Sequence, residues 1–304
     1  MINIYTHCDS FHADELMAIA LLARFHFDVS VEDLNVIRTR DENILSVAKN
    51  SNDFVIDVGR EYNSEKLNFD HHQSDPNLVW ENGGPLSSCG LIFRWLKKEG
   101  KLQSISDYTI SKLADFAYTV DQHDNGKQIW EDNKFFRAYN HSDDRVIENK
   151  QFRKALRAAE DYVDNLIFKT ELEKENNEKI EKAIKESIDG NHEDFLIVYD
   201  SLPGGRDIAV EESKAKLYIA GYKDEEKGLM EWSVKSIPSD INDPFSSRQR
   251  MPKAWCGVEG QALKDISGFN LRFCHKGGFI CVLEGSEQEV KELAKTIINI
   301  EKAE

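Results

Sequence analysis

The sequence predicts an α/β protein. An N-terminal doubly wound parallel sheet is followed, across a helical connector, by a smaller C-terminal α/β domain. The parallel sheet is predicted because strands and helices alternate along the chain. Strand-like segments at 2–7, 34–39 and 53–59 are separated by segments of helical periodicity at 12–25 and 41–50. The segment DFVIDVG at 53–59 is apolar almost throughout, as expected for a central strand covered on both faces.

Two more helices are expected before the connector, at 87–100 and 105–126. The second should end near Asn125 and Gly126, because an Asn-Gly pair commonly terminates a helix. From 146 to 189 the pattern is helical and highly charged, as in KTELEKENNEKIEKAIKES. No sustained heptad favours a coiled coil, so this segment is interpreted as a solvated helical connector.

Strand-like segments return after the connector, and a helix closes the chain. The strands are expected at 195–201, 215–222, 229–238, 269–278 and 279–285, in a more antiparallel arrangement, with the final helix at 287–302. The predicted division is therefore 1–145 for the first domain, 146–190 for the connector and 191–304 for the second domain.

Composition limits the classes of function. The formal net charge of −16 disfavours a general nucleic-acid binder, which gains affinity by neutralising phosphates with basic side chains. A phosphate-bearing substrate would have to be held locally, by metal ions or a small basic patch. The five cysteines show no C-x-x-C or zinc-finger spacing, which indicates reduced thiols.

The N-terminal segment MINIYTHC has neither a basic region followed by an apolar stretch nor an Arg-rich presequence. Elsewhere no apolar run approaches the roughly 20 residues that span a bilayer. We therefore expect a cytoplasmic protein with no membrane partner.

Histidines and aspartates gather at the predicted strand ends of the first domain. His7 and Asp57 end two strands, and ligands of open α/β sheets collect beyond such carboxyl ends, at a switch in strand order. The stretch FDHHQ and the ends of two helices supply the other candidates, which are His12, Asp14, Asp70, His71, His72, Asp121 and Asp124.

Imidazole and carboxylate ligands without cysteine suit Mn, Co, Zn or Fe, and a shared carboxylate suits a pair of metals. Two ions about 3.5–4 Å apart can hold the attacking and leaving oxygens of a phosphoryl transfer. Singly, these residues have structural explanations: Asp14 and Glu15 could cap a helix and complement its dipole, and VDQHDNG could be a helix end. Their occurrence together favours a metal site.

The motifs H-x4-H-x-D, VIDVG, DHH and VD-x-x-DNG, in this order, resemble the DHH phosphoesterase superfamily. Within it, FHADE, DVG, FDHHQ and DNG resemble the Myg-one (melanocyte proliferating gene) family of DHH-like exonucleases. WSVKSIP, MPKAWCG, SGF and HKGGFI in the second half agree with that family. The likeness covers nearly the whole chain except the charged connector.

The resemblance implies two divalent metals, most often Mn²⁺, with Mg²⁺, Co²⁺, Zn²⁺ or Fe²⁺ as alternatives. The first metal would be bound by His7, His12 and Asp57. The second would be bound by Asp14, Asp57, His71 and Asp121, with Asp57 shared and Asp124 as an additional candidate. His12 stands where many DHH enzymes carry aspartate, which leaves the preferred metal open.

The same resemblance assigns catalytic roles to Asp57, Asp70 and His72: His72 would face the phosphate, and Asp70 would orient the histidines. The second domain would bind the substrate, because Gly277 and Gly278 let the backbone approach a phosphate closely. The nearest cationic donors are Arg248, Arg250, His275 and Lys276. HKGGF also fits a plain hairpin turn, and both interpretations can hold together.

The function implied is that of a metal-dependent phosphodiesterase, a 3′-5′ exonuclease on RNA ends or short oligonucleotides, in which hydroxide held by two metals attacks phosphorus. The alternatives are hydrolysis of a small phosphate compound, such as pyrophosphate, a nucleotide or a cyclic dinucleotide, and a metal-binding regulatory protein without turnover. The sequence leaves open whether the chain forms a homo-oligomer.

Overall fold

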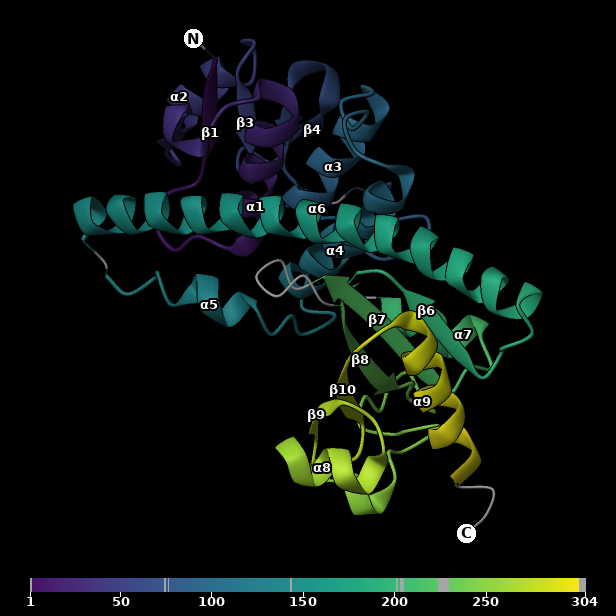
Figure 1. Ribbon diagram of the computed structural model, residues 1–304. Helices are drawn as coiled ribbons and strands as arrows, with labels where there is room; N and C mark the ends of the chain where they lie inside the picture. Colours follow the sequence, from purple (N-terminus) through teal and green to yellow (C-terminus); the bar gives the residue numbers. More distant parts are fainter. Residues whose placement is uncertain are drawn as a thin grey trace. The chain divides into compact units, whose positions relative to one another are not determined.

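The computed structural model describes residues 2–73, 75, 77–142, 144–200, 202, 205–223 and 230–300. The chain forms two compact units, residues 1–171 and 172–304, and hydrophobic cores lie within each (Figure 1). None of the described helices is long and apolar enough to cross a membrane. The predicted segments also include residues 201, 229, 301 and 302, which lie outside the described residues.

The sheet of the first unit has five strands in the order β2-β1-β3-β5-β4. They are β1 (Asn3–Thr6), β2 (Asn35–Arg38), β3 (Phe54–Ile56), β4 (Tyr62–Asn63) and β5 (Asn68–Phe69). All pairs are parallel except that of β4 with β5. The chain passes from β1 to β2 on one side and continues with β3 on the other, so the strand order switches between β1 and β3. The predicted parallel sheet is confirmed.

Helices cover both faces of this sheet, as a doubly wound sheet requires. The helices of this part of the chain are α1 (Ala13–Leu22), α2 (Glu42–Ala48), α3 (Ser88–Lys98), α4 (Asp107–Asp124) and α5 (Asn133–Arg137). α1 is buried along its whole length, as its nearly continuous apolar sequence predicts, and packs with α3. On the other face, Leu45 of α2 packs with Val55 and Val58. A π-helical turn (Ala23–Phe27) extends α1, and short 3₁₀ turns lie at Val31–Asp33, Ser64–Lys66 and Lys253–Trp255.

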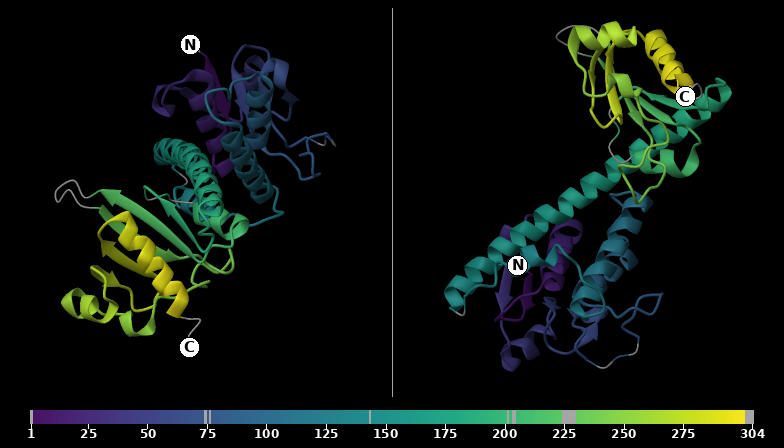
Figure 2. Two further views of the ribbon diagram at one scale, coloured as in Figure 1. Left: turned by 45° about the vertical axis from the view of Figure 1, so that its right-hand side comes forward. Right: turned by 90° about the horizontal axis from the view of Figure 1, so that it is seen from below.

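α6 (Arg145–Asp189) is a single helix of 45 residues, unbroken in both views of Figure 2. It was expected to be a solvated connector, but one face is buried. Phe152, Leu156 and Val163 belong to the core of the first unit, and Ile180 belongs to a core of the second. With Ala159 and Ile167, the buried apolar residues of the first unit recur every three or four positions and form one stripe, which explains how a charged helix contributes to a core.

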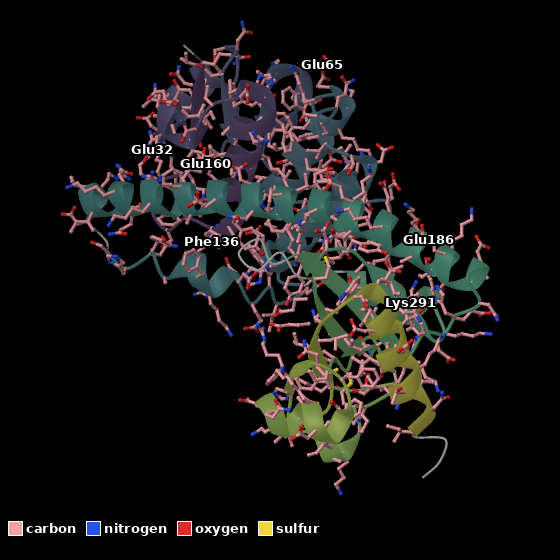
Figure 3. All side chains as sticks on the ribbon, viewed as in Figure 1. Glu32, Glu65, Phe136, Glu160, Glu186 and Lys291 are labelled. Carbon is pink, nitrogen blue, oxygen red and sulfur yellow. The ribbon has the colours of Figure 1, made fainter. Side chains whose placement is uncertain are left out.

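Hydrogen bonds also fasten α6 to the first unit. Glu160 on α6 (labelled in Figure 3) accepts from Val31 N (2.8 Å) and from Ser30 Oγ (3.1 Å). Arg157 lies 2.9 Å from Glu32 in an exposed ion pair. The first part of α6 is thus an integral layer of the first unit, and the division between the compact units falls inside the helix rather than at either of its ends.

The second unit holds a mainly antiparallel sheet, as the sequence predicts, and its strand order is β6-β7-β8-β10-β9. Its strands are β6 (Phe195–Val198), β7 (Leu217–Lys223), β8 (Met230–Ser236), β9 (Leu271–Cys274) and β10 (Ile280–Glu284), and β6 pairs with β7 in parallel. Its helices are α7 (Gly205–Glu212), α8 (Gly260–Ser267) and α9 (Glu287–Ile300). α9 buries Val290, Leu293 and Ile297 in the larger core.

Candidate metal centre

The carboxyl ends of the parallel strands bring the predicted residues together. His7 follows β1, Asp57 follows β3 and Asp70 follows β5, at the edge of the sheet where the strand order switches. Asp57 has φ 55°, in the left-handed region that residues other than glycine rarely adopt. Backbone strain of this kind persists where the surroundings enforce it, and it commonly marks functional sites.

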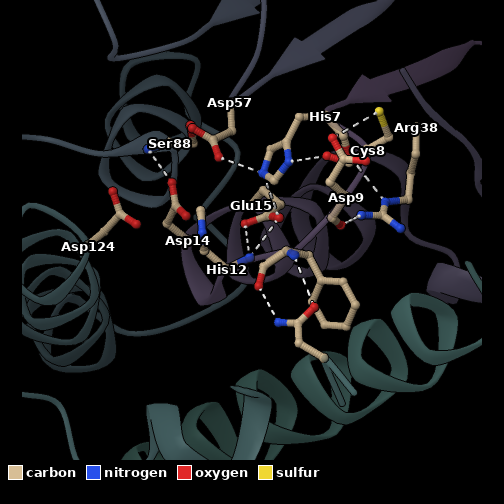
Figure 4. Close-up of polar contacts among 12 residues, drawn as sticks. His7, Cys8, Asp9, His12, Asp14, Glu15, Arg38, Asp57, Ser88 and Asp124 are labelled. Carbon is tan, nitrogen blue, oxygen red and sulfur yellow. Dashed lines mark hydrogen bonds and ion pairs between the residues drawn. The ribbon is translucent and has the colours of Figure 1, made fainter. Parts of the chain in front are cut away.

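One group of ligand atoms surrounds His7 (Figure 4). His7 Nε2 lies 3.1 Å from Glu15 Oε1 and 3.2 Å from Asp57 Oδ2. Its Nδ1 donates to Cys8 O (3.1 Å), so the lone pair of the neutral ring is on Nε2. His12 completes the group, in which the ligand atoms all lie within 4.8 Å of one another.

A second group surrounds His71. Its Nε2 lies 3.3 Å from Asp57 Oδ1, 3.3 Å from Asp124 Oδ2 and 3.9 Å from Asp14 Oδ2. Asp57 therefore presents one carboxylate oxygen to His7 and the other to His71. A carboxylate placed in this way can bind two cations at once, one through each oxygen.

The donors fit divalent metal ions. Three atoms of the cluster are buried and have no hydrogen-bond partner within the described part of the chain, namely His7 Nε2, His71 Nε2 and Asp14 Oδ1. Buried polar atoms are rarely left unpaired, and these point into a cluster of other acceptors. Imidazole nitrogen and carboxylate oxygen together suit first-row divalent ions. The cluster can thus hold metal.

The electrostatics of the cluster also favour the binding of cations. Burial, together with the charges of Asp124 and Asp57, raises the pKa of Asp14 well above its ordinary value. Burial alone would lower the pKa of His7, but Glu15 and Asp57 outweigh it and raise that pKa to about 11. Several carboxylates therefore share a buried space in which protons supply the compensating positive charge. Divalent cations would supply the same charge in place of the protons.

Asp57 behaves differently from its acidic neighbours. Burial would raise the pKa of its carboxyl, but the close contacts with His7 and His71 outweigh burial and hold the pKa far below its ordinary value. For Asp14 and Asp124 the net shift has the opposite direction: burial raises the pKa of both carboxyls above the ordinary value. Asp57 therefore stays ionised at the centre of the cluster.

His72 turns outward beside the cluster. The side chain of His72 is 54% exposed, whereas that of Asp70 is 1% exposed. His72 Nδ1 donates to Asp70 Oδ1 (2.7 Å), and Arg60 N donates to Asp70 Oδ2 (2.5 Å). The hydrogen bond to Asp70 raises the pKa of His72 above its ordinary value. Asp70 thus fixes the ring of His72, and His72 Nε2 is the ring atom left to meet a substrate.

Asp121 was expected to bind the second metal, and the structure does not bring it into either group. Its carboxylate accepts from Trp80 Nε1 (2.7 Å), Ser87 Oγ (2.6 Å) and Gly90 N (2.9 Å). Burial raises its pKa to about 7, against the effect of these hydrogen bonds. One oxygen joins α4 to the start of α3 and the other accepts from Trp80, so the geometry favours Asp124, three residues later, as the ligand from α4.

Two residues of the cluster were not among the predicted ligands. Glu15 was interpreted as a helix cap, and its carboxylate does accept from His12 N (2.9 and 3.0 Å) while facing His7. Ser88 donates from its backbone N to Asp14 Oδ2 (3.2 Å) and from its Oγ to Asp57 Oδ1 (3.3 Å). The first turn of α3 thus directs its positive dipole end toward the carboxylates.

The candidate substrate-binding residues of the second unit have different positions: some line a cavity and one stabilises a turn. Gly277 and Gly278 form the turn between β9 and β10, and Gly278 N donates to His275 O (2.8 Å). Arg250, Lys276 and both glycines line a cavity of about 350 Å³. His275 stabilises the turn instead, because its Nδ1 accepts from Gly277 N (3.0 Å). The hairpin interpretation therefore holds, and a basic cavity adjoins it.

Arg248 has a different role from the one expected. Its guanidinium donates to Val210 O (2.5 Å), Ser213 O (2.8 Å) and Ala215 O (2.9 Å) around the end of α7. Val210 is in the last turn of α7, where carbonyls have no partner within the helix, and the other two acceptors lie just beyond it. Arg248 is thus a helix-capping residue and is not among the residues that line the basic cavity.

Fold and site together define an α/β protein with a buried histidine–carboxylate cluster at a sheet switch point. The family model MYG1_exonuc, described as "Uncharacterised protein family (UPF0160)", matches residues 3–298. The chain therefore belongs to this family. The resemblance to the Myg-one family is confirmed.

Curated relatives align along most of the chain. The "MYG1 protein//CPj0489/CpB0509" of Chlamydia pneumoniae is 27% identical over 307 residues, which are 97% of this chain and 96% of the relative. The human "MYG1 exonuclease" is 26% identical over 319 residues, which are 91% of this chain and 81% of the relative.

Solved structures give weaker matches. The pGpG-specific phosphodiesterase PggH from Vibrio cholerae has a TM-score of 0.33 and 12% identity, over 100% of this chain and 99% of that chain. RecJ from Thermus thermophilus in complex with Mn²⁺ has a TM-score of 0.30 and 13% identity, over 98% of this chain and 52% of that chain. The α/β class therefore rests on the strand order and pairing themselves.

Proposed function

We propose that this protein is a metal-dependent phosphoesterase of the nuclease type. The observation that supports it most is the position of Asp57, whose two carboxylate oxygens face the unpaired Nε2 atoms of His7 and His71. A shared carboxylate between two histidine groups is an arrangement suited to a pair of divalent ions. The name of the human relative, an exonuclease, agrees with this class.

The proposed ligands are divided between two sites. His7, His12 and Asp57, with Glu15 beside them, would hold one ion; Asp14, Asp57, His71 and Asp124 would hold the other. We propose Mn²⁺ as the ion, because three of the four proposed ligands of the second site are carboxylates. When bound, such ions lower the pKa of water and neutralise charge on phosphoryl oxygens.

His72 would act on the substrate directly. Its Nδ1–H bond to Asp70 keeps the ring in place and favours the protonated form. The exposed Nε2–H can then donate to a phosphoryl oxygen or protonate the leaving oxygen. Asp70, itself buried, would be a positioning residue that stabilises the charge of His72.

The proposed substrates are RNA ends or short oligonucleotides, cleaved in the 3′-5′ direction. The net charge of −16 favours a short chain over a long duplex, which a largely acidic surface would repel. We propose that the second unit contributes phosphate contacts through Arg250, Lys276 and the backbone of Gly277 and Gly278. The same acidic character also favours a small phosphate compound as the second candidate substrate.

One experiment tests the function. Mn²⁺-loaded protein is assayed on an end-labelled RNA 20-mer, a dinucleotide and pyrophosphate, beside Asp57→Ala and the control Asp33→Ala, which alters an exposed side chain. Turnover of an oligonucleotide that Asp57→Ala loses and Asp33→Ala keeps would support the proposal. Turnover of pyrophosphate alone would favour the second candidate. A folded, metal-loaded protein that cleaves none of the three would refute the phosphoesterase function.

A further inference from the structure

A cavity of about 440 Å³ adjoins the metal cluster within the first unit. His12, Asp14 and Asp124 belong to one side of its lining. The rest of the lining comes from the loop before α1, from α4 and from α5 and the segment after it. Its volume lies within the range of about 300–1,000 Å³ that is usual for small-molecule sites. A group bound there would be a direct neighbour of the proposed reacting phosphate.

Most polar side chains of this lining already have partners. Asn140 Oδ1 accepts from Phe11 N (3.1 Å), and Asn140 Nδ2 donates to Phe11 O (2.7 Å). His123 Nδ1 accepts from Trp130 N (3.1 Å), and its Nε2 lies 2.6 Å from the side-chain amide of Asn133. These pairs hold the wall in place and leave little capacity for new hydrogen bonds.

Arg137, the last residue of α5, has no such partner among the described residues. It lines the cavity and is exposed. No hydrogen bond or ion pair joins its guanidinium to another group in the part of the chain that the structure describes. It does not pair even with Asp14 or Asp124, which line the same cavity. By contrast Lys134, on the same short helix, is paired with Glu131.

An unpaired guanidinium at the edge of an acidic site suits an anionic ligand. Arginine presents planar donors that match the oxygens of a phosphate, and such charge-assisted bonds are strong. The cluster itself would bind the phosphate that is cleaved, so Arg137 is placed for a different group of the same substrate. A second phosphate, one nucleoside away from the first, has the required charge.

We propose that this cavity binds a second phosphate of the substrate, and that Arg137 is its charged contact. The proposal rests on the phosphoesterase function proposed above. It narrows the substrate class to compounds with two phosphate groups separated by a nucleoside, such as a dinucleotide that carries a terminal phosphate. A substrate whose only phosphate is the scissile one lacks this contact.

The test compares two dinucleotides that differ only in a 5′-phosphate or a 5′-hydroxyl. The wild-type protein should prefer the phosphorylated form, and Arg137→Gln should raise its KM about 10–100-fold, with kcat changed much less. The loss should be at least tenfold greater for the phosphorylated form than for the hydroxyl form. Arg137→Lys should recover part of the preference, and Lys134→Gln should match the wild type.

Equal losses on both dinucleotides, or an unchanged preference in Arg137→Gln, would overturn the proposal and leave the phosphoesterase function intact. Calorimetric binding of adenosine 3′,5′-bisphosphate and of adenosine 5′-monophosphate, with Mn²⁺ present, gives a readout that needs no turnover. If the protein is inert but Arg137→Gln weakens only the binding of the bisphosphate, the function fails and the phosphate subsite survives. If Arg137→Gln binds both as the wild type does, the subsite is refuted.

Discussion

Adjacent histidines at 71 and 72 both lie near Asp57 Oδ1, at 3.3 and 3.5 Å, but differ in their other contacts and in their exposure. The ring of His71 is nearly buried and faces Asp57 and Asp124, while that of His72 is half exposed and bonded to Asp70. The two rings lie with their centroids 4.4 Å apart. In the proposed mechanism, His71 binds metal while His72 acts on the substrate.

We therefore predict different losses for two alanine variants. His71→Ala should lower the affinity for the second metal ion, because Nε2 is the atom that three carboxylates face. His72→Ala should keep the metal content and lower kcat by about 10²–10⁴-fold, the usual contribution of a general acid or base. Elemental analysis of purified protein and steady-state kinetics measure the two effects. Equal loss of metal in both variants would contradict the division.

The aspartates of α4 allow a second comparison. Asp124→Asn should weaken metal binding at least tenfold, because it removes a charged oxygen that faces His71. Asp121→Asn should instead keep metal affinity and destabilise the fold by about 1–3 kcal/mol. Three groups donate hydrogen bonds to the Asp121 carboxylate, and the side-chain NH₂ of asparagine would face one of them, such as Trp80 Nε1, without an acceptor.

Calorimetry with Mn²⁺ and thermal unfolding of both variants separate the roles. Loss of metal binding in Asp121→Asn, with normal binding in Asp124→Asn, would restore Asp121 as the ligand.

The individual ligands were predictable from sequence only in part. His7 and Asp57 were identified because they end predicted strands, and Asp70–His72 because of the FDHHQ motif. The structure brings them to one edge of the sheet. Glu15 and Ser88 were not, since a capping Glu and a Ser before an apolar helix are common without any metal. Their second contacts arise from how α1 and α3 pack, which no local pattern encodes.

At the scale of elements, the long and strongly patterned segments were predictable. β3 and α3 lie within their predicted ranges, and α4 ends at Asp124 before Asn125, as expected from the Asn-Gly pair. β4, β5 and α5 were not predicted, because two to five residues are too few to show a period. α5 supplies Arg137, so the cavity that it lines was not predictable either.

The contact of α3 with α4 leads to a prediction about Gly90. A Cβ at this position would overlap Asp121 Oδ2 and would lie 2.7 Å from Leu86 Cδ2. In an open helix, glycine to alanine is favourable by about 1 kcal/mol. Here we expect Gly90→Ala to destabilise the protein by about 2 kcal/mol, because the alanine displaces Asp121 from its hydrogen bonds.

Thermal unfolding of Gly90→Ala and of Lys98→Ala, an exposed control on the same helix, measures this effect. Lys98→Ala should stay within about 0.5 kcal/mol of the wild type. A stabilised Gly90→Ala would show that the two helices can separate enough to admit a methyl group, against the packing described here.

At the scale of the whole molecule, each unit has its own core, and every proposed metal ligand lies in the first unit. α6 is the element that contributes to the cores of both. Charge does not distinguish the site from the rest of the chain, because the molecule as a whole is acidic. The acidic residues of the cluster differ from the others in being buried, and burial makes their repulsion costly without cations.

Metal binding should therefore stabilise the two units unequally. A ligand that binds the folded state at 100 times its Kd stabilises that state by about 2.7 kcal/mol. Hydrogen–deuterium exchange with and without Mn²⁺ should show slower exchange in β1, β3 and the first turn of α3, whose residues hold the cluster. The amides of β7, β8 and β10 should exchange at unchanged rates. Asp57→Ala should lose the protection, and equal protection of the second unit would mean that it supplies metal ligands of its own.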